Sequence, residues 1–197
     1  MSVRLYDNAI MTKFKSWIND DKLTMLSPDE TTDLFRIVSD KKQDKPITLP
    51  LITLSRGKDI ELEYPHKKMM SYDGMMLDAT VDKSLQLDAI PMTLTYQLDI
   101  YTRYEYEADE YMRNFVFNLI NFPVIKVILP YNNINYSHNS NIRLLPTIED
   151  NSDIPERLVG DQFTRWTIRF VIDDAYLFSL PYRQNVHIVD FKIDENI

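Results

Sequence analysis

The sequence predicts an α+β fold: a mixed, largely antiparallel sheet with a long helix packed on one face, an N-terminal helix and an extended hairpin-like arm. Three observations lead to this fold class. Residues 92–100 alternate apolar and polar side chains with a period of two, which is typical of a half-buried strand. Residues 105–121 repeat apolar side chains at intervals of three and four, which is typical of an amphipathic helix. Residues 124–129 then return to an apolar strand, so the three segments form one strand–helix–strand unit.

Two helices are expected before this unit. The first has apolar side chains at helical spacing, and these are Tyr6, Ala9, Ile10, Phe14, Trp17 and Ile18. The second is expected to begin at Ser27-Pro28-Asp29-Glu30, because this run combines an N-cap serine, proline at the first helical position and glutamate three residues on. Its short apolar face consists of Leu34, Phe35 and Val38.

An early strand and a long insertion are expected next. Residues 47–54 indicate a strand, and Pro50 favours a sheet edge or a bulge, where a strand can pair between subunits. Ile60, Leu62 and Tyr64 alternate with acidic residues, which favours a hairpin arm. The chain is therefore expected to form a single domain, residues 1–197, with its core at about 1–54 and 89–197 and the arm at about 55–88.

The arm supplies most of the candidate interface residues. Two methionine pairs flank a short turn, and methionine side chains adapt to irregular apolar surfaces of partner proteins. The candidates in the arm are Met69, Met70, Tyr72, Met75 and Met76. An alternative interpretation, equally open, is that these side chains fill an ordinary gap in the core.

The helix at 105–121 has recognisable ends. Thr102 with Glu105 resembles a capping box, and the first turn is acidic, which suits the positive end of a helix dipole. Asn121 and Pro123 are expected to end it. Its apolar stripe consists of Ala108, Tyr111, Met112, Phe115, Val116, Leu119 and Ile120.

The C-terminal third is expected to contain two further strands. Residues 132–141 indicate a solvated polar loop and residues 150–160 a turn-rich connection. From Phe163 the alternation places apolar side chains on one face and Arg165, Thr167 and Arg169 on the other. Arg165 and Arg169 are therefore candidates for salt bridges within or between subunits, the alternative being a solvated strand face. Residues 186–193 indicate a final strand.

The sequence shows no recognisable catalytic, cofactor-binding or metal-binding motif. There is no cysteine, the three glycines are too few for a phosphate-binding loop, and the three histidines stand alone. Asp173-Asp174 could suggest a hard-metal site or a carboxylate couple, but adjacent strand residues point to opposite faces and the pair favours a turn. We therefore expect no enzyme, no cofactor and no metal.

Charge and hydropathy limit the partners. A net charge of −8 argues against gripping nucleic acid, because neutralising phosphates requires clustered lysine and arginine. Like charge is compatible with a ring through which DNA slides without adhering. No apolar run approaches the length needed to cross a bilayer and no secretion signal is apparent, so we expect cytosolic synthesis and no membrane partner.

Four segments carry a resemblance to a known family. They are Leu49-Pro50-Leu51-Ile52-Thr53-Leu54, residues 94–101, Glu107-Ala108-Asp109-Glu110 and residues 119–124. Over roughly residues 46–130 this order resembles the tail terminator (tail-completion) proteins of contractile-tailed phages and related phage-like injection particles. The long methionine-rich connection and the strands after Asn132 depart from that pattern.

The resemblance implies a non-enzymatic virion protein at the head-proximal end of a phage tail. Such a protein forms a ring, usually a homohexamer, that caps tail tube and sheath and joins the neck or connector proteins, while DNA passes through without specific binding. It would reside in the tail or neck of the virion, and in the host cytoplasm during assembly. Three alternatives stay open: another tail, neck or baseplate structural subunit, a small soluble enzyme with dispersed carboxylates, and a monomeric binding domain.

Overall fold

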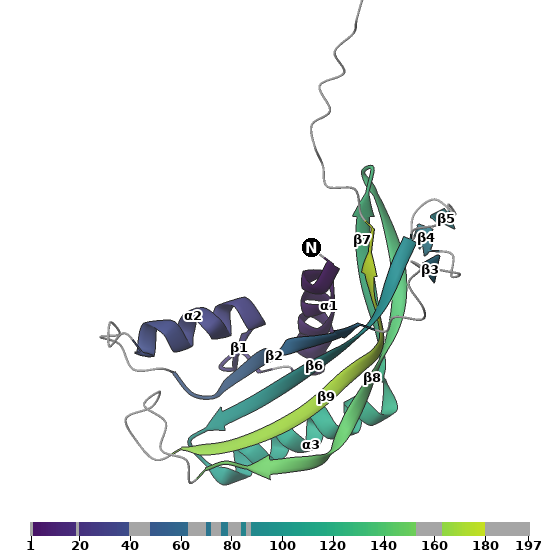
Figure 1. Ribbon diagram of the computed structural model, residues 1–197. Helices are drawn as coiled ribbons and strands as arrows, with labels where there is room; N and C mark the ends of the chain where they lie inside the picture. The colour runs from purple at the N-terminus through teal and green to yellow at the C-terminus, as the bar shows by residue number, and fades with distance from the viewer. Residues whose placement is uncertain are drawn as a thin grey trace, which may run out of the picture.

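The protein has an α+β fold, as the sequence predicts. The computed structural model describes residues 2–18, 20–39, 48–62, 70–71, 76–78, 84–85, 88–152 and 163–179. Within these ranges the chain forms three helices and nine strands (Figure 1). In chain order they are α1 (Ser2–Trp17), β1 (Thr24–Leu26), α2 (Pro28–Ser39), β2 (Leu51–Leu62), β3 (Met70–Ser71), β4 (Met76–Asp78), β5 (Ser84–Leu85), β6 (Asp88–Thr102), α3 (Glu105–Asn121), β7 (Val124–Tyr131), β8 (Ile134–Asp150) and β9 (Thr164–Phe178).

The sheet is mixed and largely antiparallel. Its strand order is β1-β2-β6-β9-β8-β4-β5, with β3 beside β6 and β7 beside β8. Among the described strand pairs only β1 and β2 run parallel. The strand–helix–strand unit of the sequence corresponds to β6, α3 and β7, and α3 has the predicted bounds.

The sheet bends because β8 changes partner along its length. Residues 134–141 of β8 pair with β7, and residues 142–144 and 148–150 pair with β9, with an irregularity between these two stretches. Asp173 and Asp174 of β9 together oppose Thr93 of β6, which makes a β-bulge, and bulges bend a strand and increase its twist. Figure 1 shows β7 and the first half of β8 standing at an angle to the diagonal strands β2, β6 and β9.

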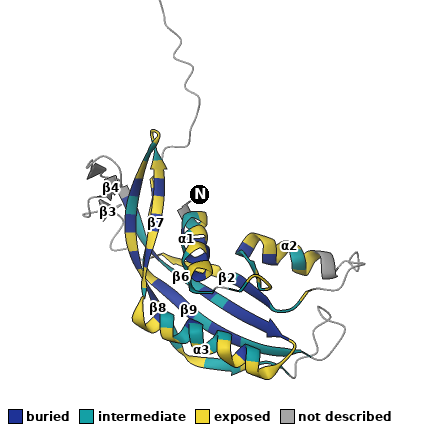
Figure 2. Ribbon diagram, turned by 180° about the vertical axis from the view of Figure 1, so that it is seen from behind, coloured by how far each residue is buried: buried dark blue, intermediate teal, exposed yellow. Residues whose placement is uncertain are grey.

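The main core lies between the sheet and two helices. Phe14 of α1 packs edge-on against Phe115 of α3 and Phe170 of β9, and Phe170 stacks on Tyr96 of β6. The predicted N-terminal stripe is confirmed, since Tyr6 also lies fully buried. Figure 2 shows the buried residues following the middle of the sheet under these helices.

A smaller cluster lies on the other face of the sheet, beneath α2. Leu51 and Tyr101 are buried there, and Leu34 of α2 packs against them. Their chain neighbours Ile52 and Ile100 belong to the main core, as the alternation of a strand requires. Phe35 is 38% exposed and stands outside both clusters.

The two predicted helix caps have different outcomes. At α2 the predicted cap is confirmed and forms a capping box, because Ser27 donates its backbone N–H and its hydroxyl to Glu30 at 2.8 Å and 2.7 Å. At α3 the capping box is wrong. The N-cap residue is Tyr104, which makes no side-chain cap, and the Thr102 hydroxyl donates instead to the Tyr104 carbonyl at 2.8 Å.

Two predictions for the C-terminal third are wrong. The expected polar loop at 132–141 is a tight turn at Asn132 and Asn133 followed by β8. Both turn residues have positive φ, 49° and 64°, which asparagine tolerates better than most residues. The expected turn at Asp173-Asp174 is the bulge inside β9. The predicted strand at 186–193 lies outside the described residues.

The first part of the expected arm belongs to the sheet. β2 continues to Leu62, and residues 60–62 pair with β6 beyond an irregularity after Arg56. Pro50 precedes β2 and follows a cis peptide bond. The described pieces of residues 63–88 return to the sheet, because β3 pairs with β6 and β4 pairs with β8.

Candidate interaction surface

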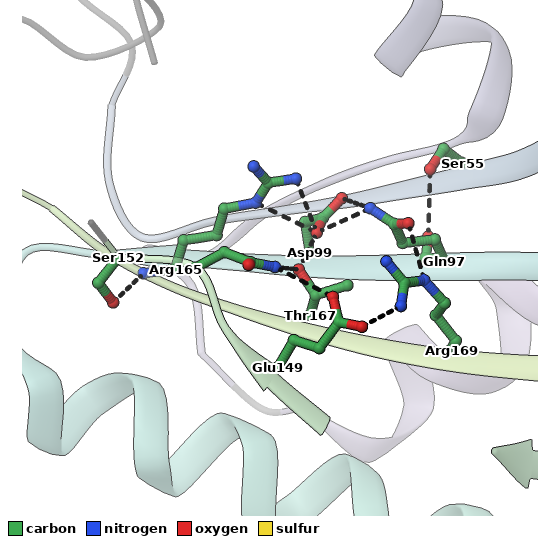
Figure 3. A network of polar contacts seen from close by, with 9 residues as sticks. Ser55, Gln97, Asp99, Glu149, Ser152, Arg165, Thr167 and Arg169 are labelled. Carbon is green, nitrogen blue, oxygen red and sulfur yellow. Dashed lines mark hydrogen bonds and ion pairs between the residues drawn. The ribbon is translucent and has the colours of Figure 1, made fainter. Parts of the chain in front are cut away.

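Arg165 belongs to a polar network on the sheet (Figure 3). Its Nη2 donates to Asp99 Oδ1 of β6 at 3.1 Å, and the two side chains are only 12% and 4% exposed. Asp99 also accepts from the Thr167 hydroxyl at 2.6 Å and from the Gln97 amide at 2.8 Å. Several hydrogen bonds therefore compensate the burial of this carboxylate.

Arg169 extends the same network to β8. Its Nε donates to Gln97 Oε1 at 3.3 Å, and its Nη1 forms an ion pair with Glu149. The hydrogen bond from Arg169 lowers the pKa of Glu149. Arg165 and Arg169 thus form salt bridges within the chain, across β6, β9 and β8, which bears out the within-subunit interpretation. These salt bridges contribute to the register of the sheet.

The methionine interface stays a prediction. Met69, Tyr72 and Met75 lie outside the described residues. Met70 and Met76 have described backbones, paired with Ala89 and Leu85, and nothing is described of their side chains.

The carboxylates of the bulge have separate protein partners. Asp173 receives two hydrogen bonds from Arg143, at 2.5 Å and 2.9 Å, and these lower its pKa. Asp174 accepts from the backbone N–H of Asn141 at 2.8 Å. The two side chains thus hold β8 to β9 at the point where the strands separate.

His138 is buried in β8, which the sequence did not predict. Its Nε2 lies 2.9 Å from the Ser140 hydroxyl, and its ring packs edge-on against Tyr176 and Phe178 at the end of β9. Burial lowers the pKa of His138, partly opposed by the nearby charge of Asp174. The other two histidines, His66 and His187, lie outside the described residues.

A buried carboxylate joins α1 to the sheet. Asp7 is 5% exposed and accepts from the Tyr96 hydroxyl at 2.8 Å and from Arg56 Nη1 at 2.5 Å. Burial and the Asp7 charge raise the pKa of Tyr96 well above its ordinary value, so this hydroxyl remains a donor. No local pattern in the sequence indicates this contact, because its partners are 49 and 89 residues away.

A groove of about 540 Å³ runs between α1 and β7. Lys13 of α1 crosses it at one end, donating from Nζ to the Val124 carbonyl at 2.6 Å, and lies 5.4 Å from the centre of the Trp17 ring. Burial lowers the pKa of Lys13. The lining residues are Leu5, Asn8, Ala9, Thr12, Lys13, Ser16, Val124, Lys126, Ile128, Pro130 and Asn135.

The edge of β7 beside this groove is open. Val124 lies opposite Asn141, and the Ile142 N–H donates to the Pro123 carbonyl at 2.7 Å. Val124 is therefore in a non-hydrogen-bonded pair, so its N–H and C=O point away from β8, as do those of every second residue after it. Among the described strands only β8 pairs with β7. The open edge thus consists of the backbone groups of Val124, Lys126, Ile128 and Pro130.

An exposed apolar patch adjoins the groove where α3 ends. Phe117, Ile120 and Phe122 are 62%, 63% and 59% exposed, and Val124 is 46% exposed. We call these four residues the α3 patch. Its exposure contradicts the predicted stripe, which placed Ile120 in the core; the stripe ends at Leu119, because Ile120 lies on the outer face with Phe117. Clustered exposed apolar side chains are typical of interaction sites, and Val124 also lines the groove.

The described residues contain no candidate metal site, and neither a family model nor a curated protein identifies the role of this surface. Within the described residues no cluster of three or more histidine and acidic side chains is placed to hold a metal ion. None of the described helices is long and apolar enough to cross a membrane. No protein-family model and no curated protein matches the sequence.

Proposed function

We propose that this protein is a structural subunit of a phage-like tail, a tail terminator that forms a ring at the head-proximal end and joins the tube and sheath to the neck. The observation that carries the proposal is that the α3 patch, the groove and the open edge of β7 share Val124. The resemblance of residues 46–130 to tail terminators supplies the identity of the assembly.

The fold supports this proposal through its rigid centre. Packing of α1 and α3 on the sheet fixes the elements that carry the surface residues, and the buried ion pair between Asp99 and Arg165 joins β6 to β9. A ring needs such a body, because each subunit must meet the next at the same angle for the rotation to close.

The chemistry of the surface also supports it. The α3 patch and the groove lie at one end of α3 and along β7, whereas α2 occupies the opposite face of the sheet. If this patch contacts a different surface of the next copy, the contact is heterologous. Heterologous contacts generate rings when the rotation closes. The net charge of −8 suits a channel that DNA passes without adhering.

The proposal is tested by the mass of the purified protein. Light scattering followed by negative-stain imaging is expected to give a closed ring, sixfold if it matches a contractile tail, either alone or after tail tube protein is added. A monomer that ignores tube protein would overturn the proposal. A ring found only at the distal end of assembled tails would favour the baseplate alternative instead.

A pair of variants links that assembly to the surface. Phe117→Asp places a charge in the α3 patch without removing core packing, so the ring is expected to be lost while the fold is retained. Phe35→Asp is the matched control on α2, where the side chain is 38% exposed and belongs to neither core cluster. Equal assembly of both variants would show that the α3 patch is not a subunit contact.

A further inference from the structure

We infer that the open edge of β7 accepts residues 186–193 of a neighbouring copy as an added strand, lying in the groove between α1 and β7. The inference rests on the proposed ring and names the segment that joins its subunits. Strand addition of this kind gains affinity from backbone hydrogen bonds and specificity from the pockets that receive alternate side chains.

The edge itself offers the required groups. Lys126 and Ile128 each present an N–H and a C=O away from β8, and Pro130 presents a C=O. Val124 presents an N–H, while its carbonyl already accepts from Lys13. Unpaired strand edges readily pair with another chain unless charge, proline or a covering element prevents it. On β7 the only proline, Pro130, stands at the far end, and Lys126 is the one charged residue between Val124 and Pro130, so the N–H of Val124 and the backbone groups of Lys126 and Ile128 stay available.

The groove gives an added strand a place to lie. Its α1 wall runs from Leu5 to Ser16, roughly 17 Å at 1.5 Å per residue, and its β7 wall from Val124 to Pro130 spans roughly 20 Å at 3.3 Å per residue. A strand of about six residues matches these lengths. Leu5 and Ala9 of α1 are apolar lining residues and can receive one face of such a strand, because α1 packs over the face of β7 that carries Ile125, Val127 and Leu129.

Another open edge among the described strands, that of β2, is less suitable. Beyond Thr53, no described strand pairs with the outer side of β2. That stretch contains Lys58, Asp59 and Glu61, all exposed, and its pairing with β6 is irregular after Arg56. Charged side chains and irregular pairing are the usual protection of an edge against strand addition. The edge of β7 has a groove beside it, whereas none of the described pockets is lined by residues 54–62.

The proposed occupant has the pattern of a strand. In Val186-His187-Ile188-Val189-Asp190-Phe191-Lys192-Ile193, the apolar residues Val189, Phe191 and Ile193 fall on one face. The other face carries Val186, Ile188, Asp190 and Lys192, and Asp194 and Glu195 follow. Asp190 and Lys192 balance each other within the segment, whereas Asp194 and Glu195 directly after it are complementary to Lys13 and Lys126, which line the groove.

The position of the end of β9 favours donation to a neighbour. β9 ends at Phe178, whose ring packs against His138 of β8. The backbone groups of β7 that remain open point away from β8, so both β8 and β7 lie between the end of β9 and this edge. The edge also adjoins the α3 patch, the proposed subunit contact, through Val124, which favours an occupant from the next copy.

The test uses disulfide trapping, which is clean because the full chain contains no cysteine. One tagged chain carries Lys126→Cys, and a second, untagged chain carries Ile188→Cys, Val189→Cys or Asp190→Cys, which together sample adjacent registers. After mild oxidation of the mixed ring, a disulfide between the tagged and untagged chains is expected for at least one pair, because directly opposed strand residues have the spacing a disulfide needs. Lys58→Cys on β2 is the matched control and is expected to give none.

Each other outcome overturns the inference. If the ring forms but the Lys126→Cys chain forms no disulfide, the inference of an added strand is wrong, and the proposed function is unaffected. A protein that carries both cysteines in one chain is also oxidised. If it forms the disulfide within the chain while the mixture of tagged and untagged chains forms none, the segment pairs with β7 of its own chain. Links to the Lys58→Cys chain assign the strand to β2. Absence of any ring, with and without tube protein, removes the proposed function and the inference with it.

A second variant tests the same segment in the full chain. Phe191→Asp is expected to abolish the ring and leave the circular dichroism of the subunit unchanged, because it places a charge on the apolar face of the added strand. Phe35→Asp again serves as control. A Phe191→Asp protein that assembles like the wild type would contradict the inference.

Discussion

At the scale of single residues, the sheet depends on polar side chains that are buried with partners. Asp7 and Asp99 each accept at least two hydrogen bonds, and each bonds to an arginine. Such pairs contribute modestly when intact but are costly to break, because the remaining charge loses its partner. These contacts therefore affect stability most clearly when one member is removed.

Replacing Asp7 with asparagine is expected to destabilise the protein. The substitution keeps the size of the side chain but leaves the Arg56 charge, whose side chain is 29% exposed, without its ion-pair partner. The expected loss is about 2–3 kcal/mol, below the range for a fully buried pair because water reaches Arg56. Urea unfolding measures it. Asp59→Asn on the exposed part of β2 is the control, and an equal effect of the two would show that the buried pair has no special role.

His138 is expected to make stability depend on pH near neutrality. Burial places its folded-state pKa below the ordinary value, so the unfolded chain takes up a proton first as the pH falls. The stability that this residue contributes is fully present above about pH 6.5 and is lost as the pH falls towards its folded-state pKa. Urea unfolding at about pH 7.5 and 5.5 should show a larger loss for the wild type than for His138→Gln. Equal losses would contradict this assignment.

At the scale of elements, the β7–β8 hairpin depends on its two-residue turn. Asn132 and Asn133 have positive φ, which β-branched residues adopt only with strain. The twist of such turns matches that of the flanking strands, so the turn sets the register that places the open edge of β7 beside α1. The turn therefore connects a local backbone preference to the candidate interaction surface.

Asn133→Val is expected to destabilise the protein by about 1–2 kcal/mol, because a β-branched residue in the left-handed region is strained. Asn135→Val is the matched control, since residue 135 lies in β8, where valine is favoured. Thermal unfolding compares the two. A neutral Asn133→Val would show that the turn does not need positive φ at this position.

The elements also show why some predictions succeeded and others failed. α3 and the apolar part of β9 were predictable, because their apolar residues repeat with one clear period. The first half of β8 was missed because its buried side chains include His138 and Ser140, which are typical of a polar loop. Ile120 was misplaced because its spacing fits the stripe, yet it lies on the outer face of α3 with Phe117.

At the scale of the whole molecule, one aromatic cluster joins α1, α3 and the sheet. Phe14 lies fully buried within 5.5 Å, centre to centre, of Trp17, Phe115 and Phe170. These contacts link the first element of the chain to the last described strand. Burial of large aromatic side chains contributes strongly to stability, so the cluster is a main determinant of the fold.

Phe14→Ala is expected to cost about 3–5 kcal/mol, because it removes a fully buried ring and leaves a cavity between three elements. Phe35→Ala is the matched control on α2 and is expected to cost less than about 1 kcal/mol, since this ring is partly exposed and outside both clusters. Chemical unfolding of both variants measures the difference. Similar costs would show that α1 packs loosely on the sheet.

The candidate surface was less predictable than the fold. The groove brings residues 5–16 together with residues 124–135, and no periodicity within either segment indicates that they meet. Arg165 and Arg169 were identified from their shared face, but their partners Asp99 and Glu149 come from strands whose register the sequence leaves open. Local patterns therefore predicted elements, while long-range pairing determined which of their residues remain exposed.

The bulge in β9 is a position at which the chain could be shorter by one residue. In β6 one residue lies between Met92 and Leu94. In β9 two residues lie between their partners, Ala175 and Ile172. A deletion of one residue at this point would restore regular pairing and leave every later partner of β9 unchanged. Related chains that lack one of these two residues would therefore keep the same strand alignment, lose one of the carboxylate contacts to β8, and differ in the bend of β9.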